Sequence, residues 1–120
     1  MNYDFTHPSR TYLACGRVDL RKGIDGLAAL VQQNYKLDPF TDVLFLFCGS
    51  RLDRIKGLYW TGDGFILVYY RKSHGHRFVW PRNSQEARQI TEKQLEWLLS
   101  GLSIDTDARV EKYRDIHKVI

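Results

Sequence analysis

Long apolar runs are missing from this 120-residue sequence. No run approaches the roughly 18 consecutive apolar residues that a membrane-spanning helix needs. The start, MNYDFTHPSR, lacks the basic segment followed by an apolar segment that marks a signal peptide. We therefore expect a cytoplasmic protein that does not contact a membrane.

Cysteines are few, and the motifs of common enzyme classes are absent. Cys15 and Cys48 both lie in apolar, strand-like runs, where a small buried thiol is the ordinary explanation. The sequence has no glycine-rich phosphate loop, no Gly-x-Ser-x-Gly elbow, no His-Glu-x-x-His and no cysteines at zinc spacing. We predict a protein that is not an enzyme, with no catalytic residues and no cofactor.

Two sets of side chains could in principle hold a metal ion. His74 and His76 are two residues apart, but they flank Gly75 in an expected turn, and their basic neighbours disfavour a cation. Carboxylates could also hold magnesium in a nuclease, although most of these aspartates fall where turns and helix starts favour Asp. We predict no metal site, and a nuclease is the least favoured function. The aspartates concerned are Asp19, Asp42, Asp53 and Asp63.

The length and the hydrophobic content of 43% fit one domain with a single core. Pro8 and Ser9 interrupt any periodicity near the start, which predicts a flexible arm over residues 1–10. We place a single α+β domain at 11–102 and a tail at 103–120. Helix-compatible spacing in this tail predicts a short helix there, through Val110, Tyr113, His117 and Ile120.

The middle of the chain predicts a sheet. Four apolar, aromatic-rich runs are separated by turn-forming segments, at Val43–Cys48, Ile55–Trp60, Phe65–Tyr70 and Arg77–Trp80. This pattern predicts a four-stranded antiparallel meander. The first run is apolar without alternation, which places it centrally with both faces buried. With a strand at Thr11–Cys15, the expected sheet is mostly antiparallel and has about five strands.

Two main helices should pack on this sheet. Asp19 is placed as the N-cap of the first, with an apolar stripe from Ile24 to Val31. Thr91 and Gln94 predict a capping box at the start of the second, whose apolar stripe leaves Trp97 exposed. Trp97 is therefore either cover for a sheet edge or an anchor for another protein.

The positive charge is concentrated in the middle of the chain. Residues 51–88 hold eight Lys and Arg against three Asp and Glu, whereas the segments on either side are nearly balanced. Concentrated basic charge attracts polyanions, and basic residues at turns and strand ends can form a phosphate-binding patch. Solvated turns are the alternative explanation. The residues we predict to contact DNA are Arg21, Lys22, Arg51, Arg54, Lys56, Arg71, Lys72, Arg77 and Arg82.

Several stretches also resemble a known family. CGRVDLRKGIDGLAALV, DPF, LFLFCGSRLDRIKGLYW, GFILVYYRK, RFVWP and ITEKQLEWLLSGL, in this order, are similar to the small accessory protein, often called TnpB or Orf2-like, of IS66-type insertion sequences. It is unrelated to the RNA-guided nuclease that shares the TnpB name. The resemblance covers residues 11–102. The positions that carry it are Asp19, Arg21, Lys22, Gly23, Arg51, Asp53, Arg54, Lys56, Arg77, Trp80 and Pro81.

This resemblance implies a non-enzymatic accessory role in transposition, beside a separately encoded transposase that performs the strand chemistry. The charge pattern adds an expected contact with DNA through the basic patch. One alternative is a docking module that binds the transposase through Trp97 and the tail without touching DNA.

Overall fold

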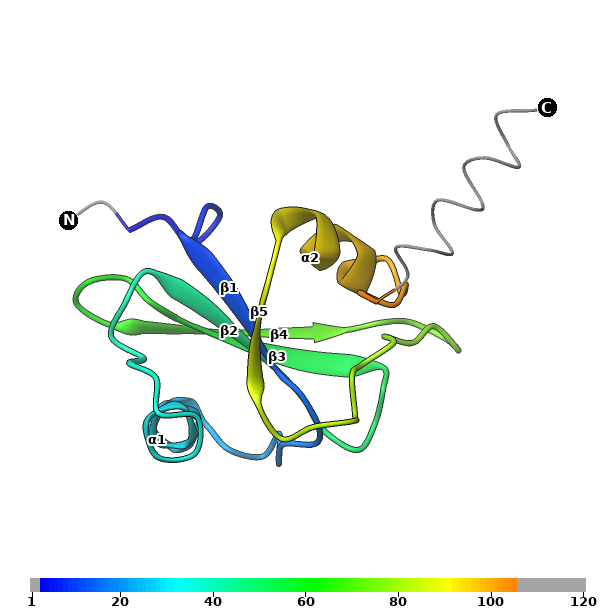
Figure 1. Ribbon diagram of the computed structural model, residues 1–120, viewed down its shortest axis with the longest axis horizontal. Coiled ribbons are helices and arrows are strands. Elements are labelled where there is room, and N and C mark those ends of the chain that lie inside the picture. Colours follow the sequence, from blue (N-terminus) through cyan, green and yellow to red (C-terminus); the bar gives the residue numbers. More distant parts are fainter. Residues whose placement is uncertain (1–2, 106–120) are drawn as a thin grey trace.

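The computed structural model describes residues 3–105 and contains one five-stranded sheet (Figure 1). The central strand β2 (Val43–Cys48) pairs parallel with β1 (Arg10–Ala14) and antiparallel with β3 (Arg54–Trp60). At the edges, β4 (Phe65–Arg71) pairs antiparallel with β3, and β5 (Ala87–Ile90) pairs antiparallel with β1. The strand order is β4-β3-β2-β1-β5. The predicted α+β class with a mostly antiparallel sheet is confirmed.

The two helices lie on opposite faces of this sheet (Figure 1). Every residue of β2 is buried, because alternate side chains pack toward α1 (Ile24–Gln33) and toward α2 (Glu92–Leu99). On the α1 face, Leu27 and Val31 of the predicted stripe are fully buried against the strands. On the α2 face, Leu98 is fully buried.

The predicted fourth strand of the meander is wrong. Residues 77–80 form no strand, and the meander ends at β4. Phe78 and Trp80 are nevertheless buried on the α2 face, and the Trp80 indole N–H donates to the carbonyl of Ala14 at 2.9 Å. Alternating apolar residues therefore cover the core here without joining the ladder. The fifth strand is β5, in a stretch for which the sequence predicted no strand.

The first helix begins later than predicted. Asp19 does accept a hydrogen bond from the backbone N–H of Arg21, at 3.0 Å, and its carbonyl accepts from the N–H of Lys22. These bonds close an isolated turn, because Gly23 is extended and α1 starts only at Ile24. The second helix has the predicted capping box at Thr91, and Gly101 beyond its end has φ of +82°.

The ends of the described chain contact the core. Tyr3 and Phe5, within the predicted arm, pack against the α2-face cluster, and Ile104, within the predicted tail, is buried there. The helix predicted from Val110 to Ile120 lies outside the described residues. Cys15 and Cys48 are both buried free thiols, as predicted. Within residues 3–105, no helix has the length and apolar character to cross a bilayer.

Candidate nucleic-acid interface

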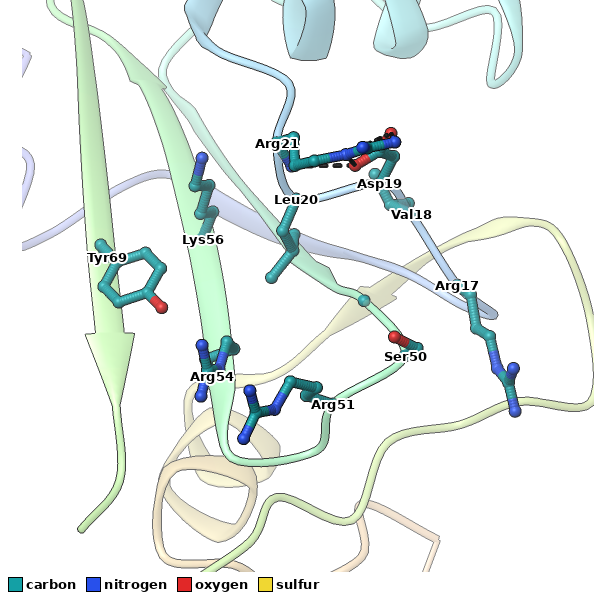
Figure 2. Close-up of a pocket in the computed structure, with 11 residues that line it drawn as sticks. Arg17, Val18, Asp19, Leu20, Arg21, Ser50, Arg51, Arg54, Lys56 and Tyr69 are labelled. Carbon is teal, nitrogen blue, oxygen red and sulfur yellow. Dashed lines mark hydrogen bonds and ion pairs between the residues drawn. The ribbon is translucent and has the colours of Figure 1, made fainter.

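An open groove of about 610 Å³ lies on the α1 face of the sheet, beside the start of α1 (Figure 2). We call it the basic groove. Its lining comes from the loop before α1, the loop between β2 and β3, and the exposed ends of β3 and β4. Five cationic side chains and a single carboxylate, Asp19, line it. The cations are Arg17, Arg21, Arg51, Arg54 and Lys56.

Strand alternation directs two of these cations and one tyrosine into the groove. On β3, Ile55 is buried on the α2 face, so Arg54 and Lys56 project from the α1 face. Tyr69 of β4 is the cross-strand partner of Lys56 and is 53% exposed. Figure 2 shows its ring beside Lys56 and Arg54. Because Leu58, nearer the other end of β3, is buried against α1, only this end of the face remains open.

Two of the cations are held by neighbouring carboxylates. Arg21 forms a two-point ion pair with Asp19, and this guanidinium lowers the pKa of the Asp19 carboxyl to about 2. Arg54 pairs with Asp53 at 2.8 Å, and its hydrogen bond lowers the pKa of that carboxyl. Both carboxylates are therefore ionised at neutral pH. They fix the direction of the two guanidinium groups and neutralise part of their charge.

The other three cations form no ion pair within residues 3–105. The Lys56 ammonium donates to the carbonyl of Lys22 at 3.2 Å, which positions it but leaves its charge intact. The side chains of Arg17 and Arg51 are exposed and form no hydrogen bond or ion pair within the described range 3–105. They project from two different loops on either side of Ser50 (Figure 2). The groove thus presents unpaired cationic groups to solvent.

Two further predicted residues lie next to the groove. Arg71 of β4 is directly opposite Arg54 in the ladder, so both project from the α1 face. Like charges placed opposite each other on neighbouring strands destabilise a sheet unless an anion compensates them. Arg77 and Arg51 line a second depression beside the loop that joins β2 to β3.

Of the other predicted basic residues, Lys22 is exposed and does not line the groove, whereas Lys72 and Arg82 are used inside the fold. Arg82 donates to the carbonyl of Gly16 at 2.7 Å and to that of Gly49 at 2.5 Å. Lys72 donates to the carbonyl of Leu99 at 2.7 Å. Its ammonium also lies 4.9 Å from the centre of the Phe78 ring, on the α2 face. Arg82 thus joins two loops, Lys72 joins the segment after β4 to the end of α2, and neither lines the basic groove.

Sequence reasoning missed Arg17 and Tyr69 as groove residues. Arg17 follows Gly16, whose φ of +82° turns the chain away from β1 and carries the next residue toward the β2–β3 loop. A lone arginine in a nearly neutral segment gave no signal of its own. Trp97 was predicted to be exposed, but it is half-buried on α2.

The candidate metal ligands are spread apart. Asp19 and Asp53 pair with arginines, Asp42 accepts from the Tyr59 hydroxyl, and Asp63 accepts from Thr61. Residues 3–105 contain no group of three or more His, Cys, Asp or Glu side chains that could hold a metal ion. The described carboxylates thus act singly, in turns and ion pairs.

The fold and the groove define a small α+β protein with positive charge gathered on one face of its sheet. The chain belongs to the family described as IS66 Orf2-like proteins, whose sequence profile matches residues 9–109. The match extends on both sides of residues 11–102, where we placed the resemblance. Membership associates the chain with an accessory role in transposition. The family is not a known enzyme class.

Two curated relatives come from Sinorhizobium fredii (strain NBRC 101917 / NGR234). "Uncharacterized protein y4hO" is 39% identical over 93 residues, covering 78% of this chain and 80% of its own. "Uncharacterized protein y4jC" is 33% identical over 93 residues, covering 78% of this chain and 79% of its own. No solved structure matches the chain.

Proposed function

We propose that this protein is a non-enzymatic accessory factor of transposition that binds DNA through the basic groove. The groove would contact the phosphate backbone, since arginine and lysine side chains form charge-assisted hydrogen bonds with phosphate oxygens. Such contacts position a protein on DNA without reading its sequence.

The observation that carries this proposal is that Arg17, Arg51 and Lys56 line one groove and form no ion pair within residues 3–105. A surface that served only solubility would gain nothing from gathering cations from three separate segments. Arg71 adds to this charge, because it is exposed opposite Arg54 and forms no ion pair within residues 3–105.

The test is binding to a labelled duplex across a salt series. We expect the logarithm of the binding constant to fall linearly with the logarithm of salt concentration, with a slope of about −0.9 for each phosphate contacted. The double variant Arg17→Glu/Arg51→Glu should lose binding at low salt. A single Arg51→Gln should reduce the slope by about 1, because one phosphate contact is removed.

The matched control is Lys36→Glu/Lys93→Glu. It makes the same change in net charge at two exposed positions that do not line the groove. This control should bind duplex as the wild type does. Equal loss in the two double variants would mean that net charge alone attracts DNA. No binding by the wild-type chain at low salt would reject direct DNA contact.

A separately encoded transposase is a second proposed partner. One observation favours a docking surface at the end of α2: Leu102 is 49% exposed and lies beside half-buried Trp97, whose carbonyl accepts from the Leu102 N–H at 2.8 Å. An exposed leucine beside a tryptophan would give a partner protein an apolar contact. Trp97→Ala should weaken capture of the element's transposase while DNA binding is unchanged. Lys93→Ala, on the same helix, is the control. Equal capture by both variants would reject this surface.

A further inference from the structure

The edge strand β4 lacks the features that usually protect a sheet edge. It has seven residues, and its first six, FILVYY, include no charge, no proline and no glycine. Natural proteins block free edges with short strands, charged side chains, prolines or bulges. Here the strand is only partly covered, and Tyr69 and Tyr70 are 53% and 42% exposed.

The backbone of β4 alternates between β3 and the open side. The N–H of Lys72 donates to the Asp53 carbonyl, and the N–H of Thr61 donates to the Gly64 carbonyl, which fixes the alternation of the ladder. Even-numbered residues of β4 therefore bond to β3. The N–H and C=O groups of residues 65, 67, 69 and 71 point outward. They bond to no other segment within residues 3–105.

The opposite edge of the sheet is different. β5 has only four residues, Ala87–Ile90, and includes a charged side chain, Arg88, that is paired with Asp105 at 2.6 Å. Short length and charge are two of the devices that block edge pairing. The contrast between the two edges indicates that β4 is left open for a strand.

We propose that the occupant is β4 of a second copy of this chain, paired antiparallel and centred on Val68. This register opposes Val68 to Val68, Ile66 to Tyr70 and Leu67 to Tyr69 of the second copy. Aliphatic, β-branched and aromatic cross-strand pairs of this kind stabilise sheets. Every side chain from residue 66 to residue 70 thus faces an apolar or aromatic side chain of the second copy.

Charge also selects this antiparallel arrangement. Arg71 is the one charged residue of β4, and the register opposes it to Phe65, whose ring face can accept a cation. The two Arg71 side chains then lie about 20 Å apart along the strands. A parallel, in-register pair would instead place them side by side, where like charges repel.

The two-fold axis of such a pair is perpendicular to the sheet, so each face of one copy continues into the same face of the other. Both basic grooves would lie on one face of a ten-stranded sheet, and the two Lys56 ammonium groups, on the strand next to β4, would be the groove cations nearest the axis. Salt would screen the repulsion between them and tighten the dimer. DNA binding should respond to salt in the opposite direction, so the two proposals can fail separately.

Sedimentation velocity without DNA tests the dimer. We expect wild-type chain to dimerise in a concentration-dependent way, and more tightly at higher salt. Tyr69→Pro should weaken dimerisation more than tenfold, because it removes an outward N–H and blocks the edge while every bond to β3 is kept. Tyr69→Ala is the matched control, since it removes the same side chain but keeps the N–H, and it should still dimerise.

Cysteine cross-linking tests the register even if Tyr69→Pro fails to fold. In the proposed pair, residue 68 faces residue 68 at a non-hydrogen-bonded position, with Cα atoms about 4.5 Å apart, within the range of a disulfide. Val68→Cys should form an intermolecular disulfide under mild oxidation. Gln89→Cys, exposed on β5, is the control and should cross-link much more slowly.

Three results would overturn the proposal: a wild-type chain that is monomeric at every concentration and salt, a folded Tyr69→Pro variant that dimerises normally, or no preferential cross-linking of Val68→Cys. A wild-type monomer whose β4 edge pairs only when transposase is added would identify the other partner instead.

Discussion

Replacing Arg82 by alanine should destabilise the fold, and this outcome separates a structural arginine from a DNA-binding one. The guanidinium bridges the carbonyls of Gly16 and Gly49, which belong to the two loops that carry Arg17 and Arg51. Hydrogen bonds to charged groups contribute about 1.5–3 kcal/mol each. Because Arg82 is half-buried, water replaces part of this contribution. We therefore expect a total loss of about 2–3 kcal/mol.

A loss of that size lowers the melting temperature of a domain of this length by about 8–12 °C. Differential scanning calorimetry of Arg82→Ala checks this value. Arg77→Ala is the control, because Arg77 is exposed and forms no hydrogen bond with residues 3–105, so its effect should stay within about 0.5 kcal/mol. An unchanged melting temperature together with weakened DNA binding would refute a structural role for Arg82 as the bridge between the two loops. Arg82 would then contact phosphate, as its place in the basic segment predicted.

Two other predictions concern the sheet and the loop before α1. In Gly57→Ala, the added Cβ would lie 2.7 Å from Cγ2 of Val68. We therefore expect the free energy of unfolding, measured in urea, to fall by about 1–3 kcal/mol. An unchanged free energy of unfolding would mean that β4 moves away easily. Asp19 has a folded pKa of about 2 against an ordinary 3.8, so its stabilising effect is complete above about pH 4 and is lost as the pH falls through about 2. In Asp19→Asn, the urea concentration at the unfolding midpoint should therefore fall less as the pH is lowered. An equal fall in the variant and the wild type would show that the Asp19–Arg21 pair does not stabilise the fold.

The strongest sequence signals identified the middle of the sheet and the apolar stripe of the first helix. β2 was predicted as central because an unbroken apolar run can be satisfied only by burial on both faces, and the structure confirms it. The capping box at Thr91 was also predicted, since it depends only on residues three positions apart. Features like these are local, so the sequence contains the information directly.

Tertiary structure decided the features that depend on distant partners. Residues 77–80 alternate like a strand, yet they do not pair with β4, and Phe78 and Trp80 are buried on the α2 face instead. Asp19 made its predicted bond to Arg21, but extended Gly23 kept that turn out of α1.

The same reason limited the candidate site. The charge count located Arg51, Arg54 and Lys56, but it could not separate them from Arg82, whose role depends on two carbonyls 33 and 66 residues away. Nor could it find Arg17, which joins the groove only when β1 and β2 pair in parallel. The sequence by itself determined the family, the α+β class and the concentration of positive charge, because these depend on residue identity and local order. Which cations share a groove depends on contacts between distant segments, and only the folded chain decides that.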